Sequence, residues 1–220
     1  MSIQETKSKY KLLKGSFEEN FRVRIHRALS WFEKAEALSK DDLDLKYITL
    51  WISFNAAYGK EVRSSVKAGD KLGFRTFILS LANLDKEKTL SKSLWTEFSQ
   101  SIKVLLDNKY TYQPYWDFYN GTSNSDIPWE ESFKKSKEKS LKALVEQDSD
   151  TLLSVVFDRL YTMRNQLVHG GATCGSQVNR LQLFDGCAIL QKLLPVMLDI
   201  MMDNYDKQDF GKPYYPYVKE

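Results

Sequence analysis

The residues of this sequence with the clearest capacity for chemistry are Arg164, Asn165 and His169. They stand near the end of residues 150–171, a segment whose apolar positions recur at helical spacing. A guanidinium group can hold a phosphate through two hydrogen bonds and stabilise charge that develops on it. A histidine can take a proton from a ribose 2′-hydroxyl or give one to the leaving oxygen. Together the three side chains suit phosphodiester transesterification, a reaction that needs no metal ion.

The spacing of these residues leaves two interpretations open. Arg164 and His169 are five residues apart, about one and a half helical turns, so on an ideal helix they do not share a face. They converge only if the helix frays near Gly170, where two glycines predict its end. The structural alternative is that Arg164 caps carbonyls at its own helix end and that His169 is a hydrogen-bonded histidine beside a tight turn.

The sequence shows no sign of a metal or cofactor site. The only other histidine is the distant His26, and no spacing of Cys, His, Asp or Glu resembles a metal-binding motif. We therefore expect neither a metal nor a cofactor. His26 itself lies beside basic residues of an amphipathic segment and is interpreted as a surface histidine.

The elements that must position these residues are helices, because strand-like alternation occurs nowhere in the chain. The predicted fold class is all-α, with an up-and-down four-helix bundle as its core. The bundle helices are expected at residues 17–38, 43–59, 150–169 and 178–205. Between the second bundle helix and the motif helix, residues 61–148 form a helical insertion or side lobe, and the whole chain, 1–220, is expected to be one domain.

Several local predictions accompany this division. Residues 1–15 are expected to be a loosely docked arm, and Ser16 with Glu19 is expected to form a capping box at the first bundle helix. Asp150 or Thr151 is expected to cap the motif helix. Residues 207–220 form an extended tail whose tyrosines anchor it on the body or on a second chain. Three further predictions concern the insertion: helices at 88–108 and 130–147, and a loop at 110–129 whose aromatic rings either pack inward or stack on unpaired bases.

Composition bounds the class of protein. The 220 residues are 42% hydrophobic and 28% charged, which suits a globular domain with a substantial core. The net charge of +3 does not by itself indicate a nucleic-acid partner. Basic clusters at Arg22/Arg27 and at 134–142 are either solvated helix faces or surfaces that steer RNA. No apolar run could span a bilayer, no signal core opens the chain, and two cysteines form no disulfide framework, so we expect a cytoplasmic protein.

The run Arg164-Asn165-Gln166-Leu167-Val168-His169, followed by Gly170, resembles the signature of the HEPN superfamily (higher eukaryote and prokaryote nucleotide-binding). That signature places an Arg, a polar residue, a short spacer and a His late in an apolar helix before a final helix. The resemblance covers the bundle helices, about half the chain. The large stand-alone, ApeA-like phage-defence forms are the members to which the chain is most similar in outline.

The resemblance implies a metal-independent endoribonuclease that acts as a homodimer, with both motifs lining one cleft. His169 would be the general acid and base, Arg164 would bind the scissile phosphate, and Asn165 would orient the pair or bond the phosphate. The products would carry a 2′,3′-cyclic phosphate and a 5′-hydroxyl. A toxin or phage-defence effector, with a cognate antitoxin or defence partner, fits this activity. The alternatives are a non-catalytic helical adaptor and a small-ligand sensor built on the aromatic stretch 110–129.

Overall fold

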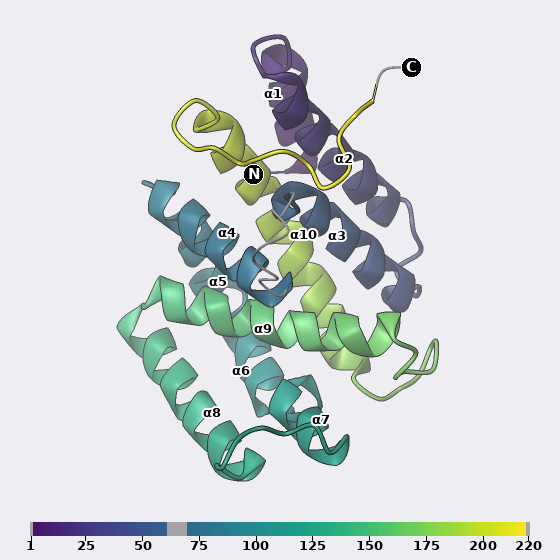
Figure 1. Cartoon of the computed structure of the whole chain (residues 1–220), viewed down its shortest axis with the longest axis vertical. Helices are drawn as coiled ribbons and strands as arrows, with labels where there is room; N and C mark the ends of the chain where they lie inside the picture. Colours follow the sequence, from purple (N-terminus) through teal and green to yellow (C-terminus); the bar gives the residue numbers. More distant parts are fainter. Residues whose placement is uncertain (1, 61–69, 219–220) are drawn as a thin grey trace.

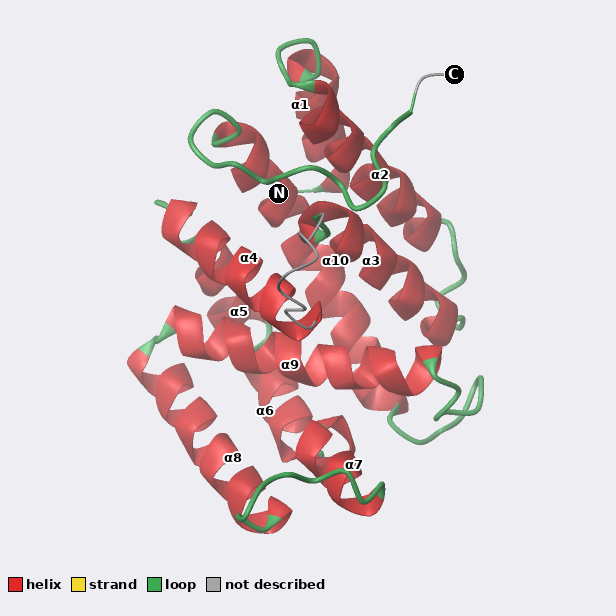
Figure 2. Ribbon diagram, viewed as in Figure 1, coloured by secondary structure: helices red, strands yellow, loops and turns green. Residues whose placement is uncertain are grey.

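The computed structural model describes residues 2–60 and 70–218, and within these ranges every regular element is a helix (Figure 2). The predicted all-α class is therefore confirmed. The first part of the predicted insertion, residues 61–69, lies outside the described residues. The elements are α1 (Ile3–Leu13), α2 (Glu19–Glu36), α3 (Leu43–Tyr58), α4 (Asp70–Leu84), α5 (Thr89–Glu97), α6 (Ser99–Asp107), the short 3-10 helix η1 (Lys109–Thr111), α7 (Gln113–Tyr119), α8 (Trp129–Glu146), α9 (Ser149–Val168) and α10 (Arg180–Asp203).

The centre of the molecule is built on α3 and α10. Helix α2 packs along α3, and α3 packs along α10, so α3 is covered on several sides (Figure 1). This position explains why α3 is apolar nearly all round, since only a central helix can bury such a surface. Helix α10 is also buried along most of its length, with Leu190, Leu194 and Met197 fully enclosed.

Helix α9 runs across this layer, and Gly186 of α10 makes the close crossing possible (Figure 1). A Cβ atom at Gly186 would lie 2.7 Å from Cε2 of Tyr47 and 3.1 Å from Cδ2 of Leu160. The Tyr47 hydroxyl donates a 2.7 Å hydrogen bond to the carbonyl of Leu160, which fixes α3 to α9 at the same place. One small residue and one buried tyrosine therefore allow α3, α9 and α10 to approach closely at this point.

The described part of the insertion packs against the rest of the molecule rather than forming a separate unit. Helices α4 and α8 lie against α9, and α5 and α6 reach α10. Their apolar residues join the same core cluster as the bundle helices. The prediction of a single helix at 88–108 is wrong, because the chain bends at Phe98 between α5 and α6. The loop predicted at 110–129 contains η1 and α7, whereas the helix predicted at 130–147 is confirmed as α8.

The predicted N-terminal arm is also wrong, because residues 3–13 form a docked helix. A capping box joins Ser2 and Glu5 at its start. Thr6 is fully buried and its hydroxyl lies 3.5 Å from the carbonyl of Pro195, while Lys9 forms ion pairs with Asp199 and Asp203 at 2.7 Å. A short polar helix is marginal alone, so its stability here comes from packing on α10.

Two predicted helix starts differ from the structure. Ser16 does not cap α2: its hydroxyl donates to the carbonyl of Leu13 and closes the preceding turn, and Glu18 is the N-cap residue. The N-cap residue of α9 is Asp148, whose carboxylate accepts a 3.1 Å hydrogen bond from the amide of Thr151. Helix α9 is thus capped by a carboxylate that lies earlier in the chain than predicted, whereas α2 begins without a side-chain cap.

The tail is anchored on the body, but through its backbone and not through its tyrosines. The guanidinium of the buried Arg24 donates to five carbonyls, those of Ala56, Ala57, Gly59, Phe210 and Gly211. Lys60 and Pro213 form an isolated antiparallel bridge. Tyr214, Tyr215 and Tyr217 are exposed, so their rings do not anchor the tail on the body, and the alternative that they anchor it on a second chain stays a prediction.

Candidate functional site

The end of α9 is a regular helix terminus that glycine makes possible. Gly170 has a φ of +71°, and the amide of Gly171 donates a 2.7 Å hydrogen bond to the carbonyl of Gln166, which is the Schellman arrangement. The predicted stop at the two glycines is confirmed. The amide of His169 still bonds the carbonyl of Asn165 at 3.0 Å, so the helix does not fray before the histidine. The expectation that fraying brings His169 toward Arg164 is therefore wrong.

Arg164 and Asn165 are brought together by this helix. The Nη1 atom of Arg164 donates a 3.0 Å hydrogen bond to Oδ1 of Asn165, and the guanidinium carbon lies 5.9 Å from the ring centroid of Tyr161. The Nε atom of Arg164 is buried and has no hydrogen-bond partner. Within the described residues, the guanidinium bonds no carbonyl of the helix end, so it is not used as a cap.

His169 stands apart from this pair. It is the exposed C-cap residue of α9, and its imidazole makes no hydrogen bond within the described residues. At 100° per residue, the side chains of Arg164 and His169 leave the helix about 140° apart. A single chain therefore presents Arg164 with Asn165 on one side of α9 and His169 on another.

The chain segments on both sides of His169 carry exposed hydrophobic side chains. Four large hydrophobic side chains from the end of α9, the connection that follows and the start of α10 are between 48% and 65% exposed. We call Val168, Val178, Leu181 and Phe184 the apolar rim. The connection that carries part of it is tied down by Asp44, whose carboxylate accepts from the amide of Gly175 at 3.2 Å and pairs with Arg180 at 2.5 Å. The rim is thus attached to a fixed part of the fold.

Sequence reasoning missed three amide side chains beside the motif: Asn108, Gln166 and Asn179. They bond one another from three different elements. No local sequence pattern predicts that these amides meet, because the two hydrogen bonds join residues that are 71 and 13 positions apart. Asn55, an amide in α3 that could have faced the site, has no hydrogen bond to Arg164 or His169, and its Oδ1 is without a partner in the described chain.

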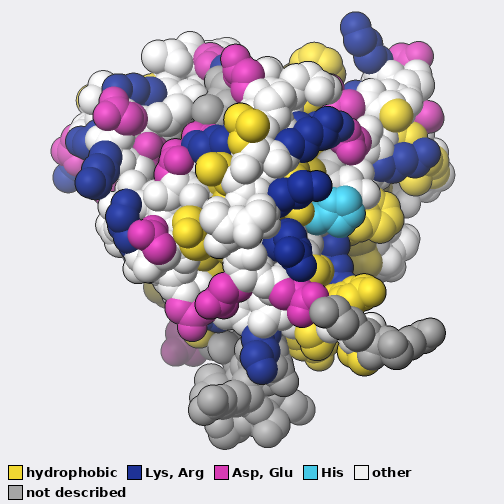
Figure 3. Space-filling view, turned by 90° about the horizontal axis from the view of Figure 1, so that it is seen from above, with side chains coloured by type: hydrophobic (Ala, Val, Ile, Leu, Met, Phe, Trp, Pro, Cys, Tyr) yellow, Lys and Arg dark blue, Asp and Glu magenta, His cyan; other side chains and the backbone are white. Residues whose placement is uncertain are grey.

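The basic clusters are largely paired or mixed with acidic groups. In α8, Lys135 pairs with Glu131, Lys137 with Asp107 and Lys142 with Glu146. Figure 3, which looks onto the face that includes α1 and α2, shows Lys and Arg side chains interspersed with Asp and Glu. These faces resemble ordinary solvated helix surfaces more closely than a continuous path for a polyanion.

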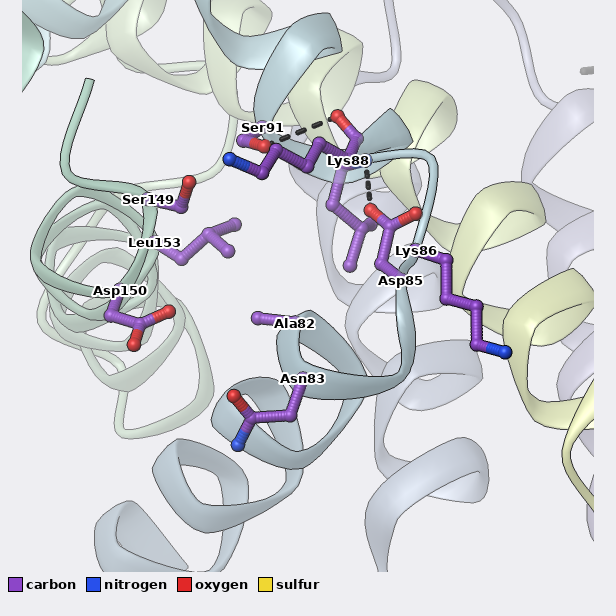
Figure 4. A pocket seen from close by; sticks show the side chains of 10 residues that line it. Ala82, Asn83, Asp85, Lys86, Lys88, Ser91, Ser149, Asp150 and Leu153 are labelled. Carbon is purple, nitrogen blue, oxygen red and sulfur yellow. Dashed lines mark hydrogen bonds between the residues drawn. The ribbon is translucent and has the colours of Figure 1, made fainter. Parts of the chain in front are cut away.

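A cleft of about 330 Å³ lies at the opposite end of α9 from the motif (Figure 4). Its lining combines Lys88 and Asp85 with Ser149 and Asp150 from the first turn of α9, over apolar residues such as Leu153. The cleft is roughly 24–30 Å from His169 along the helix. The rings of residues 110–129 do not line it, so it lends nothing to a ligand sensor built on them.

Among the residues placed in the structure, no three His, Cys, Asp or Glu side chains gather closely enough to hold a metal ion. No helix in the described ranges is long and apolar enough to cross a bilayer.

Comparison with known proteins gives no family assignment. No family model matches this sequence, and no match was found among curated proteins or solved structures.

Proposed function

We propose that this chain is a metal-independent endoribonuclease in which Arg164, Asn165 and His169 of two paired copies form the RNA-cleaving site. The observation that supports the proposal is that Arg164 has N–H donors that the described residues leave free to bind a ligand. Within the described residues its guanidinium makes one hydrogen bond, to Asn165, so most of its five N–H donors remain for a ligand. An arginine held in this way suits an anionic phosphate that gains charge in the transition state.

In the proposed reaction, the ribose 2′-oxygen bonds to the adjacent phosphorus as the bond from phosphorus to the 5′-oxygen breaks. His169 accepts the 2′-hydroxyl proton and a proton is returned to the departing 5′-oxygen, as in general acid–base catalysis. Arg164 stabilises the charged phosphorane. The products are a 2′,3′-cyclic phosphate and a 5′-hydroxyl.

The divergence of the two side chains makes a second copy part of this proposal. Because Arg164 and His169 leave α9 about 140° apart, one helix does not present both side chains to one phosphate. A two-fold pair allows His169 of one copy to meet Arg164 of the other. The apolar rim supports such pairing, since clustered exposed hydrophobic residues are typical of interaction surfaces. The setting we propose is a cytoplasmic toxin or phage-defence effector, which is the type of protein that the resemblance implies.

The decisive experiment combines cleavage with oligomeric state. Purified protein is incubated with a mixed RNA pool in EDTA, beside the Arg164→Ala and His169→Ala variants, and the product ends are identified. We expect the wild type alone to yield cyclic-phosphate ends. Cleavage that persists in both variants would place the activity elsewhere.

The pairing is tested with a charge placed in the apolar rim. Phe184→Asp should give a monomer by light scattering and also abolish cleavage, whereas Tyr217→Asp, a change at an equally exposed ring on the tail, should do neither. A monomeric wild type that still cleaves would remove the second copy from the mechanism.

A non-catalytic helical adaptor is the second candidate, and one observation favours it: Arg164 and His169 do not converge within the chain. In that case the apolar rim binds a different protein. A folded wild-type dimer without cleavage of any RNA in the pool would move the assignment to this function.

A further inference from the structure

Four residues beside the motif form a closed ring of hydrogen bonds. The amide nitrogen of Asn108 donates to Oδ1 of Asn179 at 2.8 Å, and the amide nitrogen of Asn179 donates to Oε1 of Gln166 at 3.3 Å. The amide nitrogen of Gln166 donates to the carbonyl of Tyr110. The ring closes where the backbone N–H of Tyr110 donates to Oδ1 of Asn108 at 2.8 Å. Each member gives one hydrogen and accepts one, an arrangement in which hydrogen bonds polarise and strengthen one another.

The ring joins three parts of the chain that are distant in the sequence. Asn108 and Tyr110 belong to the end of α6 and to η1, Gln166 to α9, and Asn179 is the residue just before α10. The carbonyl of Tyr110 also accepts a 2.8 Å hydrogen bond from the indole of Trp116 in α7. The aromatic lobe, meaning η1 with α7, is thereby connected to the last turn of the motif helix.

The conformation of Asn179 is independent evidence that its side chain is used for the ring. An asparagine at a helix N-cap ordinarily uses its side chain to accept from the first free amides of the helix. Asn179 occupies the N-cap of α10 but makes no such bond, and its φ is +60°. Its side chain forms hydrogen bonds within the ring, and the helix therefore lacks a side-chain cap. The positive φ is a backbone conformation that few residues tolerate.

Gln166 is placed to transmit this constraint to His169. The two residues are three positions apart, so they lie one above the other on the same side of α9. Gln166 also supplies the carbonyl that closes the glycine cap, accepting from Gly171 at 2.7 Å. Its side chain and its backbone therefore both fix the turn that carries the imidazole, and Arg164 lies on a different side of the helix.

We propose that Gln166 is a positioning residue for His169, and that the ring makes the direction of the imidazole depend on the aromatic lobe. The inference rests on the proposed function for its catalytic meaning, but its structural content stands alone. Removing a ring member should misplace His169 while leaving Arg164 and Asn165 unchanged. A misplacement of about 1 Å can lower a catalysed rate about 100-fold, so kcat should fall by that order with KM little changed.

The chain provides a direct readout, because it contains only two histidines. The two imidazole signals in a ¹H–¹³C spectrum are assigned with His169→Ala, and His26, an exposed residue of α2, serves as the internal reference. In Gln166→Leu the His169 signal should shift or broaden while that of His26 stays. Asn108→Ala and Asn179→Gly test the same ring at other members, and glycine keeps the positive φ available.

The matched control is Gln191→Leu. Gln191 is a half-buried glutamine of α10 whose amide donates to Glu36, so the change removes a side-chain hydrogen bond of similar kind far from the motif. It should leave both histidine signals and kcat unchanged. Unaltered His169 signals in folded ring variants would overturn the proposal.

The cleavage assay separates the two proposals. A shifted His169 signal in a protein that never cleaves RNA would uphold the positioning role and reject the ribonuclease. Full kcat in Gln166→Leu, beside an inactive His169→Ala, would uphold the ribonuclease and reject the positioning role.

Discussion

Substituting alanine for Gly186, where α9 crosses α10, changes the stability of the fold in two opposite ways. Alanine improves helix propensity, but its methyl group overpacks the crossing. Alanine is favoured over glycine inside a helix by about 1 kcal/mol. At Gly186, however, the new methyl group would lie 2.7 Å from the ring of Tyr47 and 3.1 Å from Leu160. Overpacking of this kind costs about 1–3 kcal/mol. Moving the fully buried Tyr47 ring would also strain or break its hydrogen bond to Leu160, a further loss of about 1 kcal/mol.

We therefore expect Gly186→Ala to lower the free energy of unfolding by about 1–3 kcal/mol, or Tm by roughly 2–12 °C for a chain of this size. Gly73 in α4 is the matched control, because a Cβ there meets only Cε2 of Tyr58 at 4.0 Å. Gly73→Ala should gain about 1 kcal/mol from propensity alone. Circular dichroism at 222 nm during urea and thermal unfolding measures both. Stabilisation by Gly186→Ala, equal to that at Gly73, would refute the tight crossing.

Three other predictions follow from buried polar groups. Arg24→Met should lower the free energy of unfolding by about 3 kcal/mol, since it leaves five carbonyls without their donor, and limited proteolysis should then cut the tail faster than in the wild type. Burial raises the pKa of Cys187 to about 12, so a thiol reagent at pH 8 should label the exposed Cys174 alone until urea is added. Because the Cys187 thiol keeps its proton in the folded protein while the unfolded thiol loses it, the contribution of this group to the free energy of unfolding falls as pH rises above about 9. Burial also raises the pKa of Asp185 despite its bond from Ser101, so Asp185→Asn should raise Tm at pH 7 and raise it less in acid, where the aspartate is already protonated.

The fold class was predictable because the long helices carry their own signals. The unbroken apolar surface of α3 requires a central position, and the glycines at 170 and 171 mark where α9 ends. The bend at Phe98 was not predictable, since neither Gly nor Pro stands there and the break depends on packing between α5, α6 and α10. Helix α1 was missed for a similar reason: its polar sequence is helical because it docks on α10.

The catalytic role of Arg164, Asn165 and His169 stays a prediction from the sequence, and part of their geometry could also be predicted. The 3.6-residue period indicates that Arg164 and His169 diverge, and the structure keeps them apart because the glycine cap closes without fraying. The ring around Gln166 could not be predicted, because hydrogen bonds across 13 and 71 residues leave no local pattern.

The contacts between the two ends of the described chain have a consequence for the order of folding. Thr6 with Pro195, Lys9 with Asp199 and Arg24 with Phe210 join partners 186 to 190 positions apart. None of these contacts can form during synthesis until the later partner, at position 195, 199 or 210, has left the ribosome. Until then Arg24 has no acceptors at 210 and 211, and α1 has no surface on which to dock. Residues 6–24 therefore wait for partners that are made about 190 residues later, and a chain cut short before residue 210 would leave Arg24 without its acceptors at 210 and 211.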